Sequence, residues 1–509
     1  MNREEKVYRR EKVAQKSNQK ESDRCDTLRR RRQFFRIRSS HRTYDKRTNK
    51  FTINIAYETA AAITPRTVAV AEAFGLGLDE QRRFIVYENV ELRIGPTDIV
   101  YITGDSGSGK SVLLKTICKD LGDSAISMAD VCIEADRPVV ETVGSTFEEA
   151  LELLSLVGLN DAFLFLRTYE QLSDGQRYRY RIAKLVESGR QWWIMDEFAA
   201  SLDRDTAKIV AFNLQKIARQ QGKAVVAATS HTDLHEDLNP TVHVHKRFGK
   251  EIVVNYRINE QKVQCSLVKE MEVTEGSMED WKKLAAFHYR SHRVSPPRKI
   301  LSLMRADELC GVIVYSYPPP TCFGRKYVMP RMTMRELNEK LSTISRVVIH
   351  PKYRAIGLGT KLIKDTVGLC GTCWVEMIAV MSKYNPFAEK AGMKKVAEQP
   401  KSDGVLRIVE TLEELGFNVH LLSSEGYVLS RLKMLSEENL ARIRGEFVAH
   451  SHGRFRKSFA CDLPFGTKEN YQKNVLNISL PKLASLIKIC GVLMQTKSYL
   501  FWEKPTQSV

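Results

Sequence analysis

The chain has 509 residues, too many for one ordinary hydrophobic core, and this length predicts roughly two to four domains. Its hydrophobic fraction of 43% and charged fraction of 28% are typical of a globular protein and exclude a disordered or fibrous chain. The best apolar stretch, Leu483 to Met494, is short and contains Lys488, so no membrane span is expected. The N-terminus lacks a signal-peptide core, and ten scattered cysteines form no dense disulfide framework. We therefore expect a cytoplasmic protein with no membrane partner.

The formal net charge of +18 is concentrated near the N-terminus, where residues 1–50 contain eighteen Lys and Arg against seven Asp and Glu. This segment includes four consecutive arginines, Arg29 to Arg32. A concentrated cationic segment can neutralise phosphates and release counterions, so it predicts contact with DNA or RNA. A solvated tail and a polybasic address signal are the alternatives. We expect residues 1–50 to be a basic, disordered arm.

Two α/β domains are predicted after this arm, because apolar strand-like segments alternate with helical patterns. In the first, residues 51–258, strands are predicted at 84–94, 98–103, 192–195 and 224–228, and helices at 178–187 and 206–220. In the second, residues 259–400, a helix is predicted at 278–292 and strands at 300–304, 310–317, 344–349 and 374–380. Residues 401–509 are expected to be a mostly helical extension of unknown function.

A glycine-rich loop lies between a predicted strand and a predicted helix in the first domain. Its sequence, Gly104-Asp105-Ser106-Gly107-Ser108-Gly109-Lys110-Ser111, matches the phosphate-loop pattern G-x-x-x-x-G-K-S/T. The glycines allow a tight turn whose N–H groups face phosphate oxygens, and the helix N-terminus adds a favourable dipole. Lys110 would reach the β- and γ-phosphates, and Ser111 would bind Mg²⁺. The loop predicts ATP binding.

Two adjacent carboxylates end a later apolar strand, residues 192–195, in the arrangement of a Walker B motif. Asp196 would hold the magnesium ion, and Glu197 would accept a proton from the attacking water. Apolar residues followed by Asp-Glu are weak evidence alone. Together with the phosphate loop upstream, they predict ATP hydrolysis.

Three further segments give the first domain a specific resemblance. Leu172-Ser173-Asp174-Gly175-Gln176 resembles the ABC signature, with Asp174 where a glycine is usual. Ser201-Leu202-Asp203 resembles the D-loop, and His231 resembles the switch histidine. The resemblance to ABC-type ATPases implies that Ser173, Gly175, Gln176 and Asp203 contact nucleotide and that His231 is catalytic. In that family two modules dimerise head to tail, with each ATP between one phosphate loop and the other signature, so an ATP-dependent homodimer is expected.

The first domain departs from the ABC pattern at the Q-loop. No glutamine lies between Ser111 and Glu170, and Asp130, Glu134 and Asp136 are acidic substitutes among which the sequence does not choose. In the family this loop couples the ATPase to transmembrane partners, so its absence disfavours the alternative of a transporter subunit. Phe74 is a candidate for the aromatic residue that stacks on adenine.

A second glycine-containing loop lies in the second domain. Arg354-Ala355-Ile356-Gly357-Leu358-Gly359 follows a predicted strand, precedes a predicted helix, and resembles the acyl-CoA loop of GNAT acetyltransferases. Glycines at a helix start leave backbone N–H groups free for a pyrophosphate. The segment from Asn385 to Met393 resembles the later GNAT segment in which an Asn precedes a helix and a turn glycine. The resemblance implies acetyl-CoA binding by Arg354, Gly357, Gly359 and Asn385.

Transfer of an acetyl group to an amine needs a base for the amine and an acid for the departing thiolate. Glu376 and Tyr384 are the candidates, although Glu376 fits a solvated strand face and Tyr384 fits packing. An aromatic cluster can be read as an acceptor pocket or as core: Trp281, Phe287-His288-Tyr289-Arg290, His292, Tyr315 and Tyr317. The pair Cys370 and Cys373 can be read as a zinc half-site or as a turn.

The order of the two domains resembles archaeal proteins in which an ATPase is fused to a predicted acetyltransferase. The second domain is also similar, more faintly, to phage Mom-like enzymes that modify adenine in DNA. We expect an ATPase whose nucleotide-driven dimerisation controls a GNAT-like N-acetyltransferase, with nucleic acid as a candidate acceptor. The alternative is a nucleic-acid-binding ATPase clamp whose GNAT-like domain is not catalytic.

Overall fold

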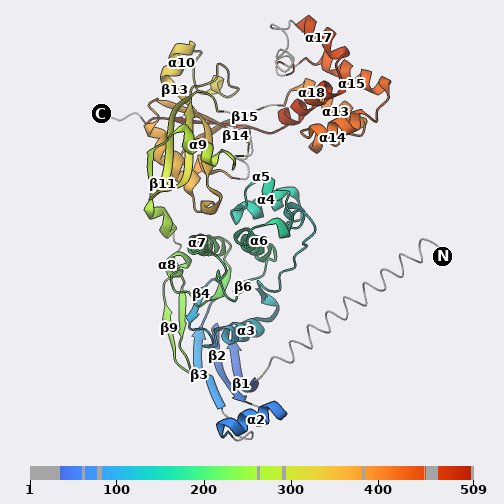
Figure 1. Cartoon of the computed structure of the whole chain (residues 1–509). Helices are drawn as coiled ribbons and strands as arrows, with labels where there is room; N and C mark the ends of the chain where they lie inside the picture. The colour runs from blue at the N-terminus through green and yellow to red at the C-terminus, as the bar shows by residue number, and fades with distance from the viewer. Residues whose placement is uncertain are drawn as a thin grey trace, which may run out of the picture. The chain divides into compact units, whose positions relative to one another are not determined.

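The computed structural model describes residues 35–505 except 60–63, 77–82, 261–263, 289–293, 381–384, 400, 452, 454 and 456–467. The chain divides into two compact units, each built around its own sheets (Figure 1). The first unit extends to Glu270 and also contains the segment Lys352–Ile356. The second contains Met271–Pro351 and the chain from Gly357 onward. The main boundary therefore follows residue 270 and not the predicted residue 258.

A three-stranded antiparallel sheet opens the first unit, with β1 (Phe35–Asp45), β2 (Lys50–Thr59) and β3 (Arg83–Arg93) in sequence order. The prediction of a disordered arm is thus wrong for residues 35–50, while residues 1–34 lie outside the described part of the chain. The cations of β1 hid its strand pattern. Arg42 pairs with Asp120 at 3.2 Å, and Tyr44 stacks on buried Phe51 at a centroid distance of 4.2 Å.

A six-stranded sheet forms the centre of the first unit and confirms the predicted α/β architecture. Its strands run parallel except β9, which is antiparallel to β8. Every residue of the central strands β4, β6 and β7 is buried, which explains their uninterrupted apolar sequences. The order is β5 (Ala125–Ser127), β6 (Trp192–Met195), β7 (Ala224–Ala228), β4 (Ile99–Gly104), β8 (Val242–Lys246) and β9 (Ile252–Tyr256).

The helices of the first unit pack apolar faces on these sheets or on one another. In α3, Leu113, Leu114, Ile117 and Leu121 are buried at helical spacing in a core shared by both sheets. The helices described are α2 (Pro65–Phe74), α3 (Lys110–Leu121), α4 (Phe147–Leu156), α5 (Ala162–Phe165), α6 (Asp174–Glu187), α7 (Arg204–Gln220) and α8 (His235–Leu238).

The second unit contains a seven-stranded sheet that is antiparallel except for one parallel pair, β13 and β14. That pair is in register only from Leu341↔Trp374 to Ile344↔Met377, although β13 continues to Ile349. The order is β10 (Met271–Glu275), β11 (Pro297–Arg305), β12 (Glu308–Ser316), β13 (Leu341–Ile349), β14 (Trp374–Ala379), β16 (Ser498–Glu503) and β15 (Lys394–Glu398).

Helices in the second unit fall into two groups. Those within the sheet-forming segment are α9 (Met278–Ala285), α10 (Met334–Lys340), α11 (Leu358–Thr366) and α12 (Phe387–Lys390). Those between β15 and β16 share a separate core and are α13 (Asp403–Glu414), α14 (Glu425–Leu432), α15 (Glu437–Ala449), α17 (Lys468–Leu476) and α18 (Leu480–Leu493).

The last strand corrects the prediction for residues 401–509. These residues are not simply a helical extension, because β16 returns to the sheet and lies between β14 and β15. Among the residues described, five helices are thus inserted between the neighbouring strands β15 and β16. Among the residues described, no helix combines the length and the apolar character needed to span a bilayer.

Candidate functional site

Three predicted segments meet at one edge of the six-stranded sheet. Strands β6, β7 and β4 are neighbours and run parallel, so their carboxyl ends lie side by side. The phosphate loop follows β4, Asp196 and Glu197 follow β6, and His231 follows β7. In open α/β sheets this edge is where ligands bind.

The phosphate loop adopts a conformation that its glycines make possible. Gly104, Gly107 and Gly109 have φ angles of +143°, +77° and +102°, a region that favours glycine. A methyl group at Gly104 would lie 1.9 Å from the backbone oxygen of Lys246, so a larger residue does not fit. Residues 105–107 are exposed, whereas Ser108 is buried. Residues 105–107 of the loop therefore face solvent, while Gly104 and Ser108 on either side are packed against the protein.

The residues predicted to hold magnesium lie together. Ser111 Oγ donates to Asp196 Oδ1 at 3.0 Å, and both side chains are oxygen ligands of the kind that Mg²⁺ prefers. Lys110 Nζ donates to the backbone oxygens of Gly104 and Asp105, both at 2.7 Å. Burial lowers the pKa of Lys110, although the carboxylates of Asp105 and Asp196 act in the opposite direction.

Glu197 is exposed and lies on a tight turn directly after β6. Its φ is +50°, and that of Ala199 is +54°, values uncommon for residues other than glycine. Two hydrogen bonds hold the turn, because Phe198 N–H donates to Ala228 O at 2.8 Å and Ala199 N–H donates to Tyr178 Oη at 3.0 Å. The strain is thus supported by buried neighbours, a pattern common at functional sites.

The switch histidine is anchored through its backbone. Tyr101 Oη donates to His231 O, and His231 N–H donates to Thr229 Oγ1 at 3.3 Å. Two residues later, Asp233 accepts from Arg204 Nε at 2.9 Å. Because Arg204 directly follows the predicted D-loop residue Asp203, this ion pair links the D-loop to the switch loop. Sequence reasoning missed Tyr101, Arg204 and Asp233, which look like ordinary strand and helix residues.

The signature residues lie at the start of α6. Ser173 Oγ accepts from Gln176 N–H at 3.4 Å, and Gln176 Oε1 accepts from Ser173 N–H at 3.0 Å, a capping box. Asp203 caps α7 by accepting from Thr206 N–H at 3.0 Å. A methyl group at Gly175 would lie 3.3 Å from Thr206 Cγ2, so the signature and the D-loop begin adjacent helices.

Two of the three acidic substitutes for the missing Q-loop glutamine, Asp130 and Glu134, lie in different surroundings. Asp130 follows β5, the strand that pairs with β6, and Met128 N–H just before it donates to Ile194 O at 2.8 Å. Asp130 therefore lies at the same sheet edge as Asp196. Glu134 instead pairs with Arg137 at 2.9 Å, farther along the loop. Phe74 lies at the end of α2 with its side chain 75% exposed.

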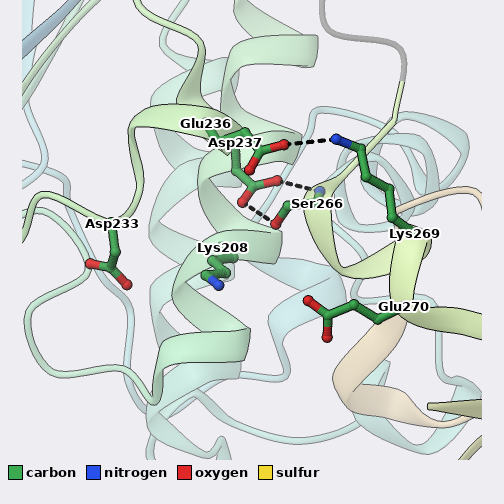
Figure 2. A pocket seen from close by; sticks show the side chains of 7 residues that line it. All are labelled: Lys208, Asp233, Glu236, Asp237, Ser266, Lys269 and Glu270. Carbon is green, nitrogen blue, oxygen red and sulfur yellow. Dashed lines mark hydrogen bonds and ion pairs between the residues drawn. The ribbon is translucent and has the colours of Figure 1, made fainter. Parts of the chain in front are cut away.

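A pocket of about 270 Å³ lies behind the switch loop (Figure 2). Two of its acidic side chains have partners among the other lining residues. Asp237 accepts from Ser266 N–H at 2.7 Å and from Ser266 Oγ at 2.6 Å, and Lys269 Nζ pairs with Glu236 at 3.0 Å. The pocket is lined by Lys208, Asp233, Glu236, Asp237, Ser266, Lys269 and Glu270.

In the second unit, the predicted acyl-CoA segments meet at the start of α11. Gly357 caps this helix with φ +84°, and Thr360 Oγ1 donates to Phe387 O at 3.1 Å. A methyl group at Gly359 would lie 3.1 Å from the Phe387 ring, and Asn385 is half-buried two residues earlier. Arg354 belongs to the segment of the first unit, where its Nη1 lies 3.3 Å from Asp161 Oδ2.

Glu376 occupies a different environment from either of those predicted. Its side chain is buried, so the prediction that Glu376 lies on a solvated strand face is wrong. Its oxygens accept from Arg325 Nε at 2.9 Å, Thr343 Oγ1 at 2.7 Å and Tyr499 Oη at 3.0 Å. A buried carboxylate that already accepts these hydrogen bonds is poorly placed to take a proton from a substrate amine, which argues against the predicted catalytic base. Tyr384 lies outside the described residues.

The aromatic cluster of the second domain is mainly core. Trp281 packs among Leu284, Ile300 and Val312, and Tyr315 is buried with its hydroxyl 2.7 Å from Thr366 Oγ1. Residues 289–293 lie outside the described part of the chain. Cys370 is buried and Cys373 exposed, and no metal-binding group of three or more side chains occurs among the residues described.

Comparison with known proteins places these findings in context. No protein-family model matches the chain. The cytochrome c biogenesis ATP-binding export protein CcmA of Reclinomonas americana is 28% identical over 180 residues, which cover 30% of this chain and 80% of that protein. The methionine import ATP-binding protein MetN of Xanthomonas oryzae pv. oryzae is 27% identical over 190 residues, which cover 30% of this chain and 56% of that protein.

Solved structures similar to the chain include an ATP-binding cassette described as a dimer in a post-hydrolysis state with ADP and Pi. It has a TM-score of 0.29 and 21% identity, and the match covers 34% of this chain and 92% of that one. The chain contains an ABC-type ATPase module over about 30% of its length.

Proposed function

We propose that the first unit binds Mg²⁺ and ATP and hydrolyses the γ-phosphate bond. The contact between Ser111 and Asp196 at the end of the phosphate loop carries this proposal. It joins the two predicted magnesium ligands beside Lys110, on an edge where backbone N–H groups and a helix N-terminus favour phosphate. The same residue types at unrelated positions in the fold would not support nucleotide chemistry.

The roles of the side chains follow from their placement. Lys110, which already bridges two loop carbonyls, has to turn its ammonium group toward the phosphates. Glu197 is exposed beside Asp196 and can accept a proton from the attacking water. The bound magnesium ion supplies charge neutralisation on the phosphate oxygens. His231, fixed through its backbone, is proposed to contact the γ-phosphate, and Asp130 is proposed to take the place of the Q-loop glutamine.

The active form is proposed to be a nucleotide-dependent homodimer. The start of α6 is exposed at Ser173 and Asp174, so it is available to the ATP of a second copy in the head-to-tail arrangement that the resemblance implies. Asp174 adds a negative charge where that phosphate would lie. Its nearest cation, Arg177 Nη1, is 3.7 Å away and offsets part of this charge.

The second unit is proposed to be an acyl-CoA-dependent N-acetyltransferase. The support comes from the start of α11 and from the parallel pair β13 and β14, whose register ends at Ile344↔Met377 while β13 continues. A strand that continues past its partner can pair with an extended ligand that carries amides, as the pantetheine arm of acetyl-CoA does. The left-handed cap at Gly357 leaves the first N–H groups of α11 available for the pyrophosphate.

Replacing Gly357 with valine is expected to weaken acetyl-CoA binding by at least 10-fold, because a β-branched residue strains the left-handed cap. Calorimetric titration of the full chain with acetyl-CoA measures this. Gly371→Val is the matched control, since Gly371 has φ +83° and open space around it but lies after the helix. Equal loss in both variants would argue against a site at α11, and no binding by the wild type would reject the cofactor.

Nucleic acid is the proposed acceptor or ligand, through the basic N-terminal segment. Because β1 begins at Phe35, the segment that can be removed without cutting the sheet is residues 1–34, which contain twelve Lys and Arg against six Asp and Glu. Deleting it is expected to weaken DNA or RNA binding and to flatten the dependence of log affinity on log salt. Fluorescence anisotropy at several salt concentrations measures both. An unchanged slope would place nucleic-acid binding elsewhere or exclude it.

Two other functions are supported by particular observations. The buried state of Glu376 leaves the second unit without an assigned base and favours an ATPase clamp that binds nucleic acid and lacks transferase chemistry. The relatives are named as ATP-binding proteins of export and import, which favours a transporter subunit. Radiolabel transfer from acetyl-CoA to DNA or RNA would exclude the clamp. Co-purification with an integral membrane protein would favour the transporter.

A further inference from the structure

A tyrosine from the neighbouring sheet lies beneath the phosphate loop. Tyr87 in β3 is 1% exposed, and its hydroxyl donates to the backbone oxygen of Gly109 at 2.9 Å. Gly109 is the residue before Lys110 and the N-cap of α3. The hydrogen bond therefore joins the three-stranded sheet to the last peptide of the loop. No sequence motif indicates this contact, since Tyr87 looks like any core residue of a strand.

The geometry of that peptide determines what the contact does. Gly109 O also accepts from Val112 N–H at 3.0 Å and Leu113 N–H at 3.1 Å, so it points into the helix. Peptide bonds are planar and trans, so the N–H of Lys110 points the opposite way, out of the helix N-terminus. Any restraint on the carbonyl of Gly109 is therefore a restraint on the N–H that faces the phosphates.

Gly109 needs such a restraint from outside the helix. Its φ of +102° lies in a region that glycine enters and leaves at little cost. No side chain can take over the role, because a methyl group on Gly109 would lie 2.5 Å from Val86 Cγ1 and 3.6 Å from the Tyr87 ring. Val86 and Tyr87 together form the surface on which the end of the loop rests.

A buried lysine fixes the tyrosine ring. Lys246, at the end of β8, is 0% exposed, and its Nζ lies 5.2 Å from the centroid of the Tyr87 ring. The ammonium also donates to Arg247 O at 2.7 Å and to Gly249 O. In the β4–β8 ladder Lys246 pairs with Gly104, the first residue of the loop. One residue thus supports the loop at Gly104 through its backbone and near Gly109 through Tyr87.

We propose that Tyr87, held by Lys246, is a positioning residue for nucleotide: it fixes the Gly109–Lys110 peptide so that the Lys110 N–H and side chain meet the β- and γ-phosphates. The inference rests on the proposed ATP binding and adds a residue to it. Tyr87 acts through the loop and does not touch the phosphates. Its loss is expected to weaken every ligand that carries a phosphate chain, with or without adenine.

The test compares full-length wild type, Tyr87→Phe and Tyr180→Phe by calorimetric titration with Mg²⁺ and either ATP or inorganic tripolyphosphate. Tyr180 is a matched control, since it is 0% exposed and its hydroxyl lies 2.8 Å from Thr142 Oγ1, among residues outside the phosphate loop. Tyr87→Phe is expected to lose about 3- to 10-fold in affinity for both ligands, the range of one hydrogen bond. In steady state, KM for ATP should rise by the same factor while kcat stays within about twofold.

Other outcomes separate this inference from the proposed function. ATP binding by wild type and Tyr87→Phe with equal affinity would overturn the inference and leave ATP binding intact. Equal losses in Tyr87→Phe and Tyr180→Phe would show a general effect of packing and would also overturn it. If Tyr87→Phe does not fold, Lys246→Met is tested in its place, because it keeps the tyrosine hydroxyl and removes only the lysine that holds the ring. The inference then requires that Lys246→Met lose affinity for ATP and for tripolyphosphate by the same factor. A wild type that binds neither ligand would reject the proposed function itself.

Discussion

Glu197→Gln is expected to slow ATP hydrolysis by about 100- to 10,000-fold, the usual contribution of a general base, while ATP still binds. The carboxylate is exposed on its turn and accepts no hydrogen bond that folding requires, so glutamine fits the same position. ATP that is bound but not cleaved should also trap the homodimer. Phosphate release measures the first effect, and light scattering after gel filtration with Mg²⁺ and ATP measures the second.

The control is Glu148→Gln, an exposed glutamate in the first turn of α4. This variant should leave both the rate of ATP hydrolysis and the molar mass measured with Mg²⁺ and ATP as they are in the wild type. Undiminished hydrolysis by Glu197→Gln would remove the residue from the mechanism. If Glu197→Gln hydrolyses ATP slowly but forms no ATP-dependent dimer, Glu197 remains the proposed base and the head-to-tail dimer is rejected.

Arg325→Met is expected to destabilise the second unit by about 3–5 kcal/mol, because it leaves the Glu376 carboxylate buried without its cation. Glu376 is 0% exposed, and Arg325 Nη2 lies 2.5 Å from its Oε1. Arg325 Nη1 also donates to Pro319 O at 2.6 Å, so the loop after β12 loses an anchor as well. Urea titration followed by hydrogen–deuterium exchange in β13, β14 and β16 localises the loss.

The exposed pair Arg335 and Glu339 provides the comparison, since its side chains are 90% and 61% accessible. Arg335→Met should cause no measurable change. The double variant Arg325→Met with Glu376→Leu should recover part of the stability, because no uncompensated charge remains. A single variant as stable as the wild type would show that the pair of Arg325 and Glu376 does not stabilise the second unit.

The site of the first unit could largely be predicted because its chemistry is local in sequence. Gly104 to Ser111 form one continuous loop, and Asp196 and Glu197 follow one apolar strand. Each motif is therefore a short stretch of sequence whose place in the fold follows from the strand before it. The order of the central strands then brings Ser111 and Asp196 to 3.0 Å. The proposal of Asp130 in place of the Q-loop glutamine could not be made from the sequence, because it depends on β5 lying next to β6.

The errors came from contacts between residues far apart in the chain. The burial of Glu376 could not be predicted, because its partners Arg325 and Tyr499 are distant in sequence and carry no motif. The strand β1 was not predicted because its many cationic residues are typical of a solvated tail, although one of them, Arg42, pairs with Asp120. The strand β16 follows a long helical segment, so nothing near it indicates which sheet it joins. Such pairings are properties of the folded topology and have no local signal.

The position of β16 determines when the second unit can fold during synthesis. The ribosome releases β14 and β15 first, then the whole helical segment, and only then the strand that separates them. Until residues 498–503 emerge, neither β14 nor β15 has the strand that lies between them, and unpaired strand edges are prone to pair with other chains. A stop codon or a protease cut anywhere in the inserted helices would therefore remove the middle of a sheet and not a dispensable tail.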